Sequence, residues 1–195
     1  PVPRGRTVDI AELEAGDPLP PPYVVKPVSE GSSVGVEIIR SGDNRRAEVA
    51  RAWKFGRAAL VEEYIPGREL TVGVMGDRAL AVTEIMADAG VFYDYESKYA
   101  EGGSRHVIPA SVHPDVYARA LDVAVGAHRA LGCRGATRCD FRYDDTAGIA
   151  GLSCLEVNTQ PGMTQTEQVA DLARHAGMAV GELVAWMVED ASLNR

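Results

Sequence analysis

Short stretches in which hydrophobic and polar residues alternate fill the first half of the chain, and this period of two is typical of half-buried β-strands. The run Tyr23–Val28 is rich in β-branched residues, and a second run follows at Val36–Ile39. Three more alternating stretches lie at Ala59–Ile65, Leu70–Met75 and Ala79–Ile85. Because the turn sequences Pro66-Gly67 and Gly76-Asp77 separate these stretches, the pattern predicts antiparallel strands joined by short turns.

The second half of the chain contains helical patterns as well as strands. The clearest helix is predicted over Pro114–Leu131, where apolar residues recur on one face and Gly132 ends the run. Further helices are predicted at Asn44–Gly56, Gln165–His175 and Val180–Asp190, and strands at Thr137–Tyr143 and Leu152–Val157, on either side of the turn-like Asp144–Gly151. Helices mixed with mostly antiparallel strands in this order predict an α+β fold, or an α/β sandwich built from two lobes.

Composition and charge narrow the class of protein. The chain has 195 residues, of which 46% are hydrophobic, and its formal net charge is −8, so a sizeable core is expected. Nucleic acids and anionic membranes require basic patches, and we expect neither as a partner. Three cysteines without a CxxC spacing argue against a disulfide scaffold, and Cys133, Cys139 and Cys154 are expected to fill core space. A cytoplasmic enzyme fits these properties best.

The first 22 residues are rich in proline and acidic residues and are predicted to form a polar connector. The chain does not begin with Met and has no basic-then-apolar targeting segment. We therefore expect it to be part of a longer protein.

Lys26 precedes the sequence Glu30-Gly31-Ser32-Ser33-Val34-Gly35, which is a candidate phosphate-binding loop. Glycines allow a backbone to approach an anion closely, and consecutive N–H groups can surround it beside the fixed cation. The sequence matches neither of the common phosphate-loop patterns. A tight hairpin turn with a surface lysine explains this segment equally well.

Arg138, Asp140, Glu156 and Asn158 form a second candidate group. Alternate residues of a strand share a face, so Arg138 points the same way as Asp140, and Glu156 the same way as Asn158. If the two strands are neighbours, three oxygen donors converge beside an arginine, and hard oxygen ligands suit Mg²⁺. The alternative is a solvated polar face opposite the core.

The segment Asn158–Thr164 contains a Pro-Gly turn directly before a predicted helix. The N–H of Gly162 could donate to a developing oxyanion. Taken alone, the segment is more simply interpreted as a turn.

Five segments together resemble the D-alanine–D-alanine ligases of the ATP-grasp superfamily. They are VVKPVSEGSSVGV (24–36), VEEYIPGRELTVGVM (61–75), FYDYESKYAEGG (92–103), GATRCDF (135–141) and CLEVNTQPGMT (154–164), and they occur in the family's order. The resemblance extends from Pro22 onward.

The resemblance implies an ATP-grasp fold in which antiparallel sheets of two lobes enclose the nucleotide. It implies a central lobe at 23–75, a C-terminal lobe at 76–195, and the absence of the family's N-terminal domain, through which a homodimer would form. The implied reaction joins two D-alanines for peptidoglycan synthesis. ATP phosphorylates one carboxylate, and the amine of the second D-alanine attacks the acyl phosphate.

The resemblance also assigns residues to the binding of ATP. Lys26 corresponds to the phosphate-binding lysine, Ser32 and Ser33 to the tip of the loop, and Glu69 to the carboxylate that binds ribose. The complete set of implied ATP-binding residues is Lys26, Glu30, Ser32, Ser33, Glu62, Glu63, Tyr64, Ile65, Glu69 and Lys98, of which Glu62 to Ile65 form the adenine-binding linker.

The implied catalytic groups are Arg138 and the Gly162 N–H, which stabilise the transferred phosphoryl group and the oxyanion, together with Ser32 and Tyr99. Tyr99 corresponds to a loop residue that accompanies dipeptide rather than depsipeptide formation. Asp140, Glu156 and Asn158 correspond to the ligands of two Mg²⁺ ions, which Mn²⁺ can replace.

One position departs from the family pattern. Glu167 stands where the family has a serine that holds the carboxylate of the second D-alanine. Two alternatives to the ligase therefore stay open: an ATP-grasp ligase with a different second substrate, and a module that binds ATP and Mg²⁺ without turnover.

Overall fold

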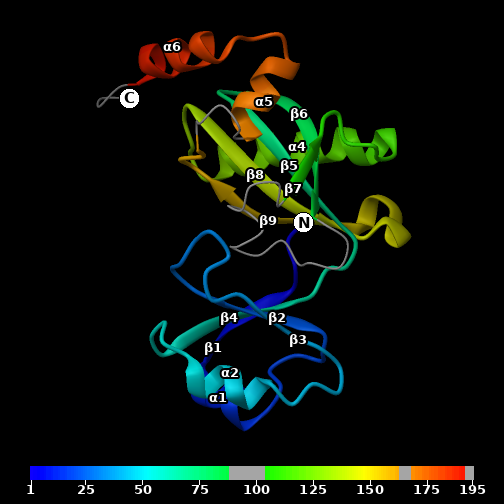
Figure 1. Ribbon diagram of the computed structural model, residues 1–195, viewed down its shortest axis with the longest axis vertical. Coiled ribbons are helices and arrows are strands. Elements are labelled where there is room, and N and C mark those ends of the chain that lie inside the picture. Colours follow the sequence, from blue (N-terminus) through cyan, green and yellow to red (C-terminus); the bar gives the residue numbers. More distant parts are fainter. Residues whose placement is uncertain (88–103, 163–167, 192–195) are drawn as a thin grey trace. The chain divides into compact units, whose positions relative to one another are not determined.

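The computed structural model describes residues 1–87, 104–162 and 168–191, and within them it contains two antiparallel β-sheets with helices (Figure 1). The chain divides into two compact units. One consists mainly of Pro3–Ile65, and the other contains Pro1–Val2, Pro66–Met86 and the described residues from Arg105 onward. The predicted α+β class is confirmed, and no helix in the described part of the chain is long and apolar enough to cross a membrane.

The first unit is a four-stranded sheet with the strand order β1-β4-β2-β3. Its elements are β1 (Gly5–Asp9), α1 (Ile10–Ala15), β2 (Tyr23–Pro27), β3 (Glu37–Ile39), α2 (Arg46–Ala52) and β4 (Ala58–Glu63). Alternate residues of these strands, among them Tyr23, Val25 and Val61, point into one hydrophobic core with Leu13 of α1 and Val49 of α2. The opposite face of the sheet carries Lys26 and Glu62 together with Val24 and Leu60.

The prediction that residues 1–22 form a connector is wrong. Within this segment, β1 pairs with β4 along its full length, and Asp9 caps α1 by accepting a hydrogen bond from the Ala11 N–H at 3.0 Å. Only Val8 in the strand and Leu13 in the helix are buried, so the segment has no clear hydrophobic period. Its order depends on β4, which lies about 50 residues away, and not on local pattern.

The second unit is a five-stranded sheet with the order β7-β6-β5-β8-β9. Its elements are β5 (Arg68–Met75), β6 (Arg78–Ala87), β7 (Ser104–Val107), α4 (Pro114–Ala130), β8 (Ala136–Tyr143), the 3₁₀ helix η1 (Asp145–Gly151), β9 (Leu152–Asn158), α5 (Gln168–His175) and α6 (Val180–Asp190). Leu70, Val72, Cys139 and Phe141 pack against α4 in the core of this unit.

The boundary between the lobes lies near Ile65, and not after Met75 as predicted. β5 pairs with β6 and β8 and therefore belongs to the second sheet. The turn at Gly76 is only a hairpin within that sheet, whereas the chain passes between units at Pro66-Gly67. Gly67 has a φ of +89°, and a Cβ there would lie 2.3 Å from the Tyr143 carbonyl oxygen, so glycine is required at this crossing.

The helices after β9 pack on the second sheet through small residues. A Cβ atom on Gly73 would lie 2.9 Å from Leu172 of α5, so the absence of a side chain permits the close approach of helix and strand. Val169, Ala173 and Leu183 form a further cluster with Ala136 at the start of β8. The predicted helices at 165–175 and 180–190 are thus confirmed from Gln168 onward.

His128 is a buried histidine in α4, with its Nδ1 atom 2.8 Å from Thr137 Oγ1. Burial lowers the pKa of His128 below its usual value, because the charged imidazolium loses hydration. As the pH falls below ~6.5, the unfolded chain binds a proton that the folded chain resists binding, so the free energy of unfolding decreases.

We therefore predict that His128→Asn destabilises the protein by about 1 kcal/mol at pH 8 through loss of the hydrogen-bonded ring. The difference between parent and variant should shrink at pH 5, because only the parent loses stability through the histidine. Urea unfolding of both proteins at the two pH values measures this. A difference that is the same at both pH values would contradict the assignment.

Thr71 of β5 and Thr83 of β6 face each other in the sheet, and both are fully buried. The Thr71 hydroxyl donates to Asp140 Oδ1 at 2.6 Å, whereas Thr83 Oγ1 has no hydrogen-bond partner. A hydrogen bond to a charged acceptor contributes more than a neutral one, and an unpartnered buried hydroxyl is unfavourable.

Thr71→Val should therefore lower the free energy of unfolding by roughly 1.5–3 kcal/mol. The matched variant Thr83→Val should leave it unchanged or raise it. Both substitutions have the same shape and the same burial, so denaturant unfolding of the pair isolates the hydrogen bond to Asp140. Equal losses in the two variants would show that packing, and not this bond, sets the stability here.

Candidate functional site

The candidate phosphate loop connects β2 to β3 and has an unusual backbone. Ser32 and Ser33 have φ values of 53° and 61°, in the left-handed region that non-glycine residues rarely adopt. The Val34 N–H donates to the Gly31 carbonyl at 3.1 Å and closes a tight turn around the two serines. Consecutive strained residues cluster at functional sites, so the loop geometry favours a binding role over a simple hairpin.

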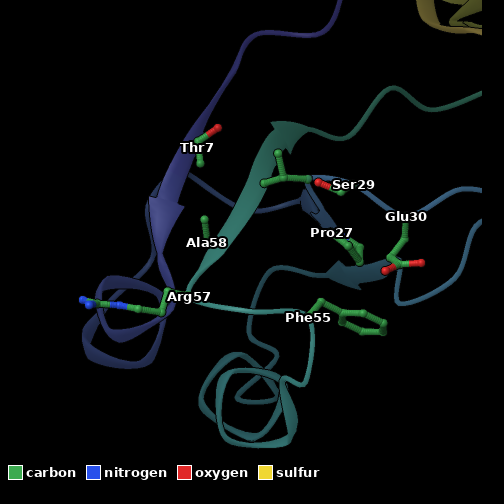
Figure 2. Close-up of a pocket in the computed structure, with 8 residues that line it drawn as sticks. Thr7, Pro27, Ser29, Glu30, Phe55, Arg57 and Ala58 are labelled. Atoms are coloured by element: carbon green, nitrogen blue, oxygen red, sulfur yellow. The ribbon is translucent and has the colours of Figure 1, made fainter.

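Gly35 fixes the base of this loop. Its φ is +71°, and a Cβ atom there would lie 2.4 Å from the Phe55 ring. Any larger residue would displace the loop or the ring, so the loop and the Phe55 segment are held together. A cavity of about 320 Å³ lies beside them. Of the residues that line it, Figure 2 shows Glu30 and Phe55 near Pro27, and the Arg57 side chain extending away from Phe55.

Lys26 and Glu62 form an ion pair on the face of the first sheet opposite its core, with 2.5 Å between Lys26 Nζ and Glu62 Oε2. Lys26 lies opposite Leu60, and Val24 lies opposite Glu62, so the two side chains are diagonal neighbours on adjacent strands. The structure thus brings the predicted phosphate-binding cation and one predicted adenine-binding residue together.

Glu63 follows Glu62 in β4 and so points to the opposite face of the sheet. Its carboxylate accepts hydrogen bonds from the Arg4 backbone N–H at 3.1 Å and the Arg4 guanidinium at 3.2 Å. The Tyr64 N–H donates to the Pro22 carbonyl at 3.3 Å. The predicted linker therefore begins as a continuation of the first sheet, and its adenine-binding role stays a prediction.

On the second sheet, β8 and β9 bring the other predicted group together. Arg138 pairs with Asn158, and Asp140 pairs with Glu156. The two Asp140 oxygens accept hydrogen bonds from the Arg138 guanidinium at 2.8–3.2 Å. Asp140 is buried, whereas Glu156 is exposed. The four side chains lie as the sequence predicted, on one face of neighbouring strands.

A β-bulge determines which way Glu156 points. The register shifts between Asp140 and Phe141, so Cys154 pairs with Phe141 of the core face while Glu156 pairs with Asp140. Without the bulge, residues 154 and 156 would share a face. The extra residue in β9 therefore turns Glu156 away from the core and toward Asp140.

Two polar side chains of this face were missed by the sequence reasoning. Thr71 donates to Asp140, and Arg142 lies 3.6 Å from Glu69, with their Nη1 and Oε2 atoms closest. Arg142 also donates to the Gly67 carbonyl at 2.8 Å. Thr71 alternates with Glu69 in β5, and Arg142 alternates with Asp140 in β8. This pattern indicates a shared polar face only once β5 is known to pair with β8.

The segment after β9 begins with a side-chain turn. Asn158 Oδ1 accepts a hydrogen bond from the Gln160 N–H at 3.0 Å, Pro161 is buried, and Gly162 is exposed. The turn is thus anchored at its start and ends in an accessible backbone. The roles predicted for Asn158 and Gly162 require such access, and they stay predictions.

The chemistry of this face suits a divalent cation that is only partly held by protein. Asp140, Glu156 and Asn158 supply carboxylate and amide oxygens, the ligands that Mg²⁺ prefers. Across residues 1–87, 104–162 and 168–191, no group of three or more His, Cys, Asp or Glu side chains could by itself hold a metal ion. The donor set therefore fits an ion that takes its remaining ligands from a phosphate-bearing substrate.

The cysteines do not belong to this face. Cys139 and Cys154 are buried in the core as expected, whereas Cys133 is only half-buried. The hydrogen bond with Cys154, together with burial, raises the pKa of Cys139 above its usual value. Its side chain packs in the core beside Cys154, on the face of the sheet opposite Asp140.

Three predicted residues lie outside the described residues. They are Lys98 and Tyr99, in the segment 88–103, and Glu167, in the segment 163–167.

Comparison with known proteins supplies the family. The family model described as D-ala D-ala ligase C-terminus matches residues 11–189. A D-alanine–D-alanine ligase of Granulibacter bethesdensis is 63% identical over 193 residues, which cover 98% of this chain and 62% of that protein. The chain therefore spans less than two thirds of the length of this relative.

Solved structures agree on the fold. A D-alanine–D-alanine ligase from Bacillus anthracis, complexed with ATP, aligns with a TM-score of 0.73 at 23% identity and covers 97% of this chain and 60% of that chain. The VanG D-Ala:D-Ser ligase from Enterococcus faecalis aligns with a TM-score of 0.74 at 28% identity, covering 96% and 56%. The fold is that of the ATP-grasp D-alanine ligases.

The structure contains the two features on which the resemblance rests most, the paired strands β8 and β9 and the serine loop after Lys26. Together with the match over residues 11–189, this shows that the chain belongs to the D-alanine–D-alanine ligase C-terminus family.

Proposed function

We propose that the protein containing this chain is a cytoplasmic, ATP-dependent ligase that joins two D-alanines for peptidoglycan synthesis. One observation carries the proposal: Arg138 and Asp140 lie in register with Asn158 and Glu156 on the polar face of the second sheet. Phosphoryl transfer depends on positioned cations and oxygen ligands more than on a covalent nucleophile, and this face supplies both. The named activity of the relatives supports the same reaction.

In the first unit, the proposal assigns the triphosphate to Lys26 and to the loop that carries Glu30, Ser32 and Ser33. Lys26 is held in place by Glu62, so its ammonium group is oriented before nucleotide arrives. The strained turn presents two hydroxyl-bearing residues at its tip. Residues 62–65 are proposed to bind adenine. The Bacillus anthracis ligase, whose fold this chain shares, is complexed with ATP, which supports ATP as the nucleotide.

In the second unit, Glu69 is proposed to bind ribose, and Asp140, Glu156 and Asn158 to hold Mg²⁺ or Mn²⁺, with two ions expected. When bound, the cation neutralises phosphate charge and orients the transferred group. Arg138 is aligned by its hydrogen bonds to both oxygens of Asp140. Its guanidinium is proposed to lie along this face and to donate to the phosphoryl oxygens. The Gly162 N–H is proposed to donate to the oxyanion of the tetrahedral intermediate.

The remaining parts of the proposal rest on the resemblance alone. They are the binding of ATP by Lys98, a role for Tyr99 in substrate selection, and the homodimer of the family. Tyr99, with Ser32, is proposed to select an amine as the second substrate. A ligase with a different second substrate stays an alternative, since the VanG relative is by name a D-Ala:D-Ser ligase.

Measurement of ADP release distinguishes the D-alanine ligase from a ligase with a different second substrate and from a module that binds ATP without turnover. Turnover that requires D-alanine supports the ligase, and turnover with another amino or hydroxy acid supports the alternative substrate. The measurement is made on the full-length protein that contains this chain. Nucleotide binding by that protein without turnover under any of these conditions would overturn the ligase proposal.

Glu156→Gln should abolish Mg²⁺-dependent turnover, because it removes one negative charge from the proposed metal ligands while keeping the shape of the side chain. Glu156 is exposed, so the free energy of unfolding should change by no more than about 0.5 kcal/mol. Steady-state kinetics and thermal unfolding measure the two effects. Glu189→Gln, on the exposed side of α6, is the matched control and should be active. An active Glu156→Gln enzyme would refute the metal assignment.

Glu167→Ser tests the departure from the family pattern. Two carboxylates ~4 Å apart repel by about 4 kcal/mol at an effective dielectric constant near 20, so Glu167 cannot face the carboxylate of a well-bound second D-alanine. We expect Glu167 to turn away from the substrate, and the KM for the second D-alanine to be the same in Glu167→Ser and in the parent. A large decrease in KM would instead show that the glutamate intrudes on the site and would support the alternative substrate.

A further inference from the structure

Cys139 and Cys154 form a buried pair of thiols directly behind the candidate metal-binding face. Their Sγ atoms are 3.3 Å apart, and the two residues are 0% and 7% exposed. A disulfide has an S–S distance of about 2.05 Å, so the sulfur atoms need to approach by only ~1.3 Å more to be bonded. Neither thiol has a role in the proposed reaction.

The pair joins the two strands that carry the candidate site. Cys139 lies between Arg138 and Asp140 in β8, and its side chain points into the core on the opposite face from both. Cys154 lies in β9 just before the bulge that turns Glu156 toward Asp140. A bond between the sulfurs would therefore span the bulge from behind.

The two cysteines are not directly opposite each other, and this decides where movement must occur. Cys139 pairs with Val157, while Cys154 pairs with Phe141. The Cys154 backbone N–H is held by the Pro1 carbonyl at 2.9 Å. Leu155, between Cys154 and Glu156, is the residue of β9 that the register with β8 skips. We expect closure of the sulfur pair to be taken up at this residue, directly before Glu156.

We propose that Cys139 and Cys154 are a reversible oxidation site, and that their disulfide turns the enzyme off by displacing Glu156 relative to Asp140. The second half of this proposal rests on the proposed function, whereas the first half does not. Nothing else in the described part of the chain brings two cysteine sulfurs together, since Cys133 is a free, half-buried cysteine.

With hydrogen peroxide as the oxidant, the chemistry balances. The Cys154 sulfur, the more exposed of the two, attacks a peroxide oxygen and breaks the O–O bond. The sulfur becomes a sulfenic acid, and the thiol proton joins the leaving hydroxide as water. The second sulfur then attacks the sulfenic sulfur, and the hydroxyl group leaves with the proton of the second thiol as another water. Two thiols and one peroxide thus give one disulfide and two waters, and a small dithiol reverses the reaction by exchange. In a reducing compartment the bond forms only transiently, as expected of a sensor.

The oxidation is tested by treating the native protein with hydrogen peroxide, blocking the remaining thiols with N-ethylmaleimide and mapping peptides by mass spectrometry. We expect a disulfide between the peptides of Cys139 and Cys154, and a blocked Cys133. Cys133→Ser is the matched control and should form the same disulfide. Cys139→Ser and Cys154→Ala should both prevent it, and two variants guard against failure of one to fold. Separate, uncrosslinked cysteines, or pairing with Cys133, would overturn the proposal.

The switch is tested by the affinity of the protein for ATP in the presence of Mg²⁺, measured by calorimetry before oxidation, after it and after dithiothreitol. Displacing a ligand of the ion should weaken binding by roughly 10–100-fold, and dithiothreitol should restore it. Cys139→Ser should be insensitive to peroxide. An unchanged affinity in the fully crosslinked protein would overturn the switch. If the reduced protein does not bind ATP at all, the proposed function fails, and the peptide map still decides the oxidation site by itself.

Discussion

The antiparallel pairing of β8 with β9 is the interaction on which the candidate site depends. Side chains alternate between the two faces of a strand, so a slip of one residue would exchange the polar face with the core face. Here the hydrophobic residues Phe141 and Val157 fix the register from the core side, and the polar pairs Arg138–Asn158 and Asp140–Glu156 follow from it. By strict alternation, Glu156 would point into the core like Cys154. The bulge between them turns Glu156 toward Asp140 instead.

A second constraint is the cost of burying Asp140. A carboxylate with little access to water must be compensated, and removal of a buried partner typically costs about 3–5 kcal/mol. Arg138 of β8 and Thr71 of β5 compensate it, so two adjacent strands stabilise this carboxylate. The same bonds that stabilise Asp140 also fix the direction of the Arg138 guanidinium. The same hydrogen bonds therefore stabilise the buried carboxylate and orient the arginine. In the first sheet, Glu62 orients Lys26 in the same way through their ion pair.

Most strands and the long helix could be predicted from the sequence, because Tyr23–Pro27, β8 and α4 each carry a strong local period. Elements without such a period were missed. β1 buries only Val8, and its order comes from pairing with the distant β4. The lobe boundary was misplaced because a hairpin turn and a crossing between units have similar Pro and Gly signals, and only strand pairing separates them. Arg138, Asp140, Glu156 and Asn158 were found by alternation, whereas Thr71 and Arg142 required knowledge of the β5–β8 pairing.

We propose that the polar face shared by β8 and β9 forms a divalent metal site for a nucleotide-bound ion. A crystal structure with Mn²⁺ and a non-hydrolysable ATP analogue tests it most directly, because the anomalous scattering of manganese locates the ion independently of any assumed role. We expect an anomalous peak for manganese within ligand distance of side-chain oxygens of Asp140, Glu156 and Asn158 and of phosphate oxygens of the analogue. Bound analogue with manganese elsewhere, or with no protein oxygen from β8 or β9 as a ligand, would contradict it.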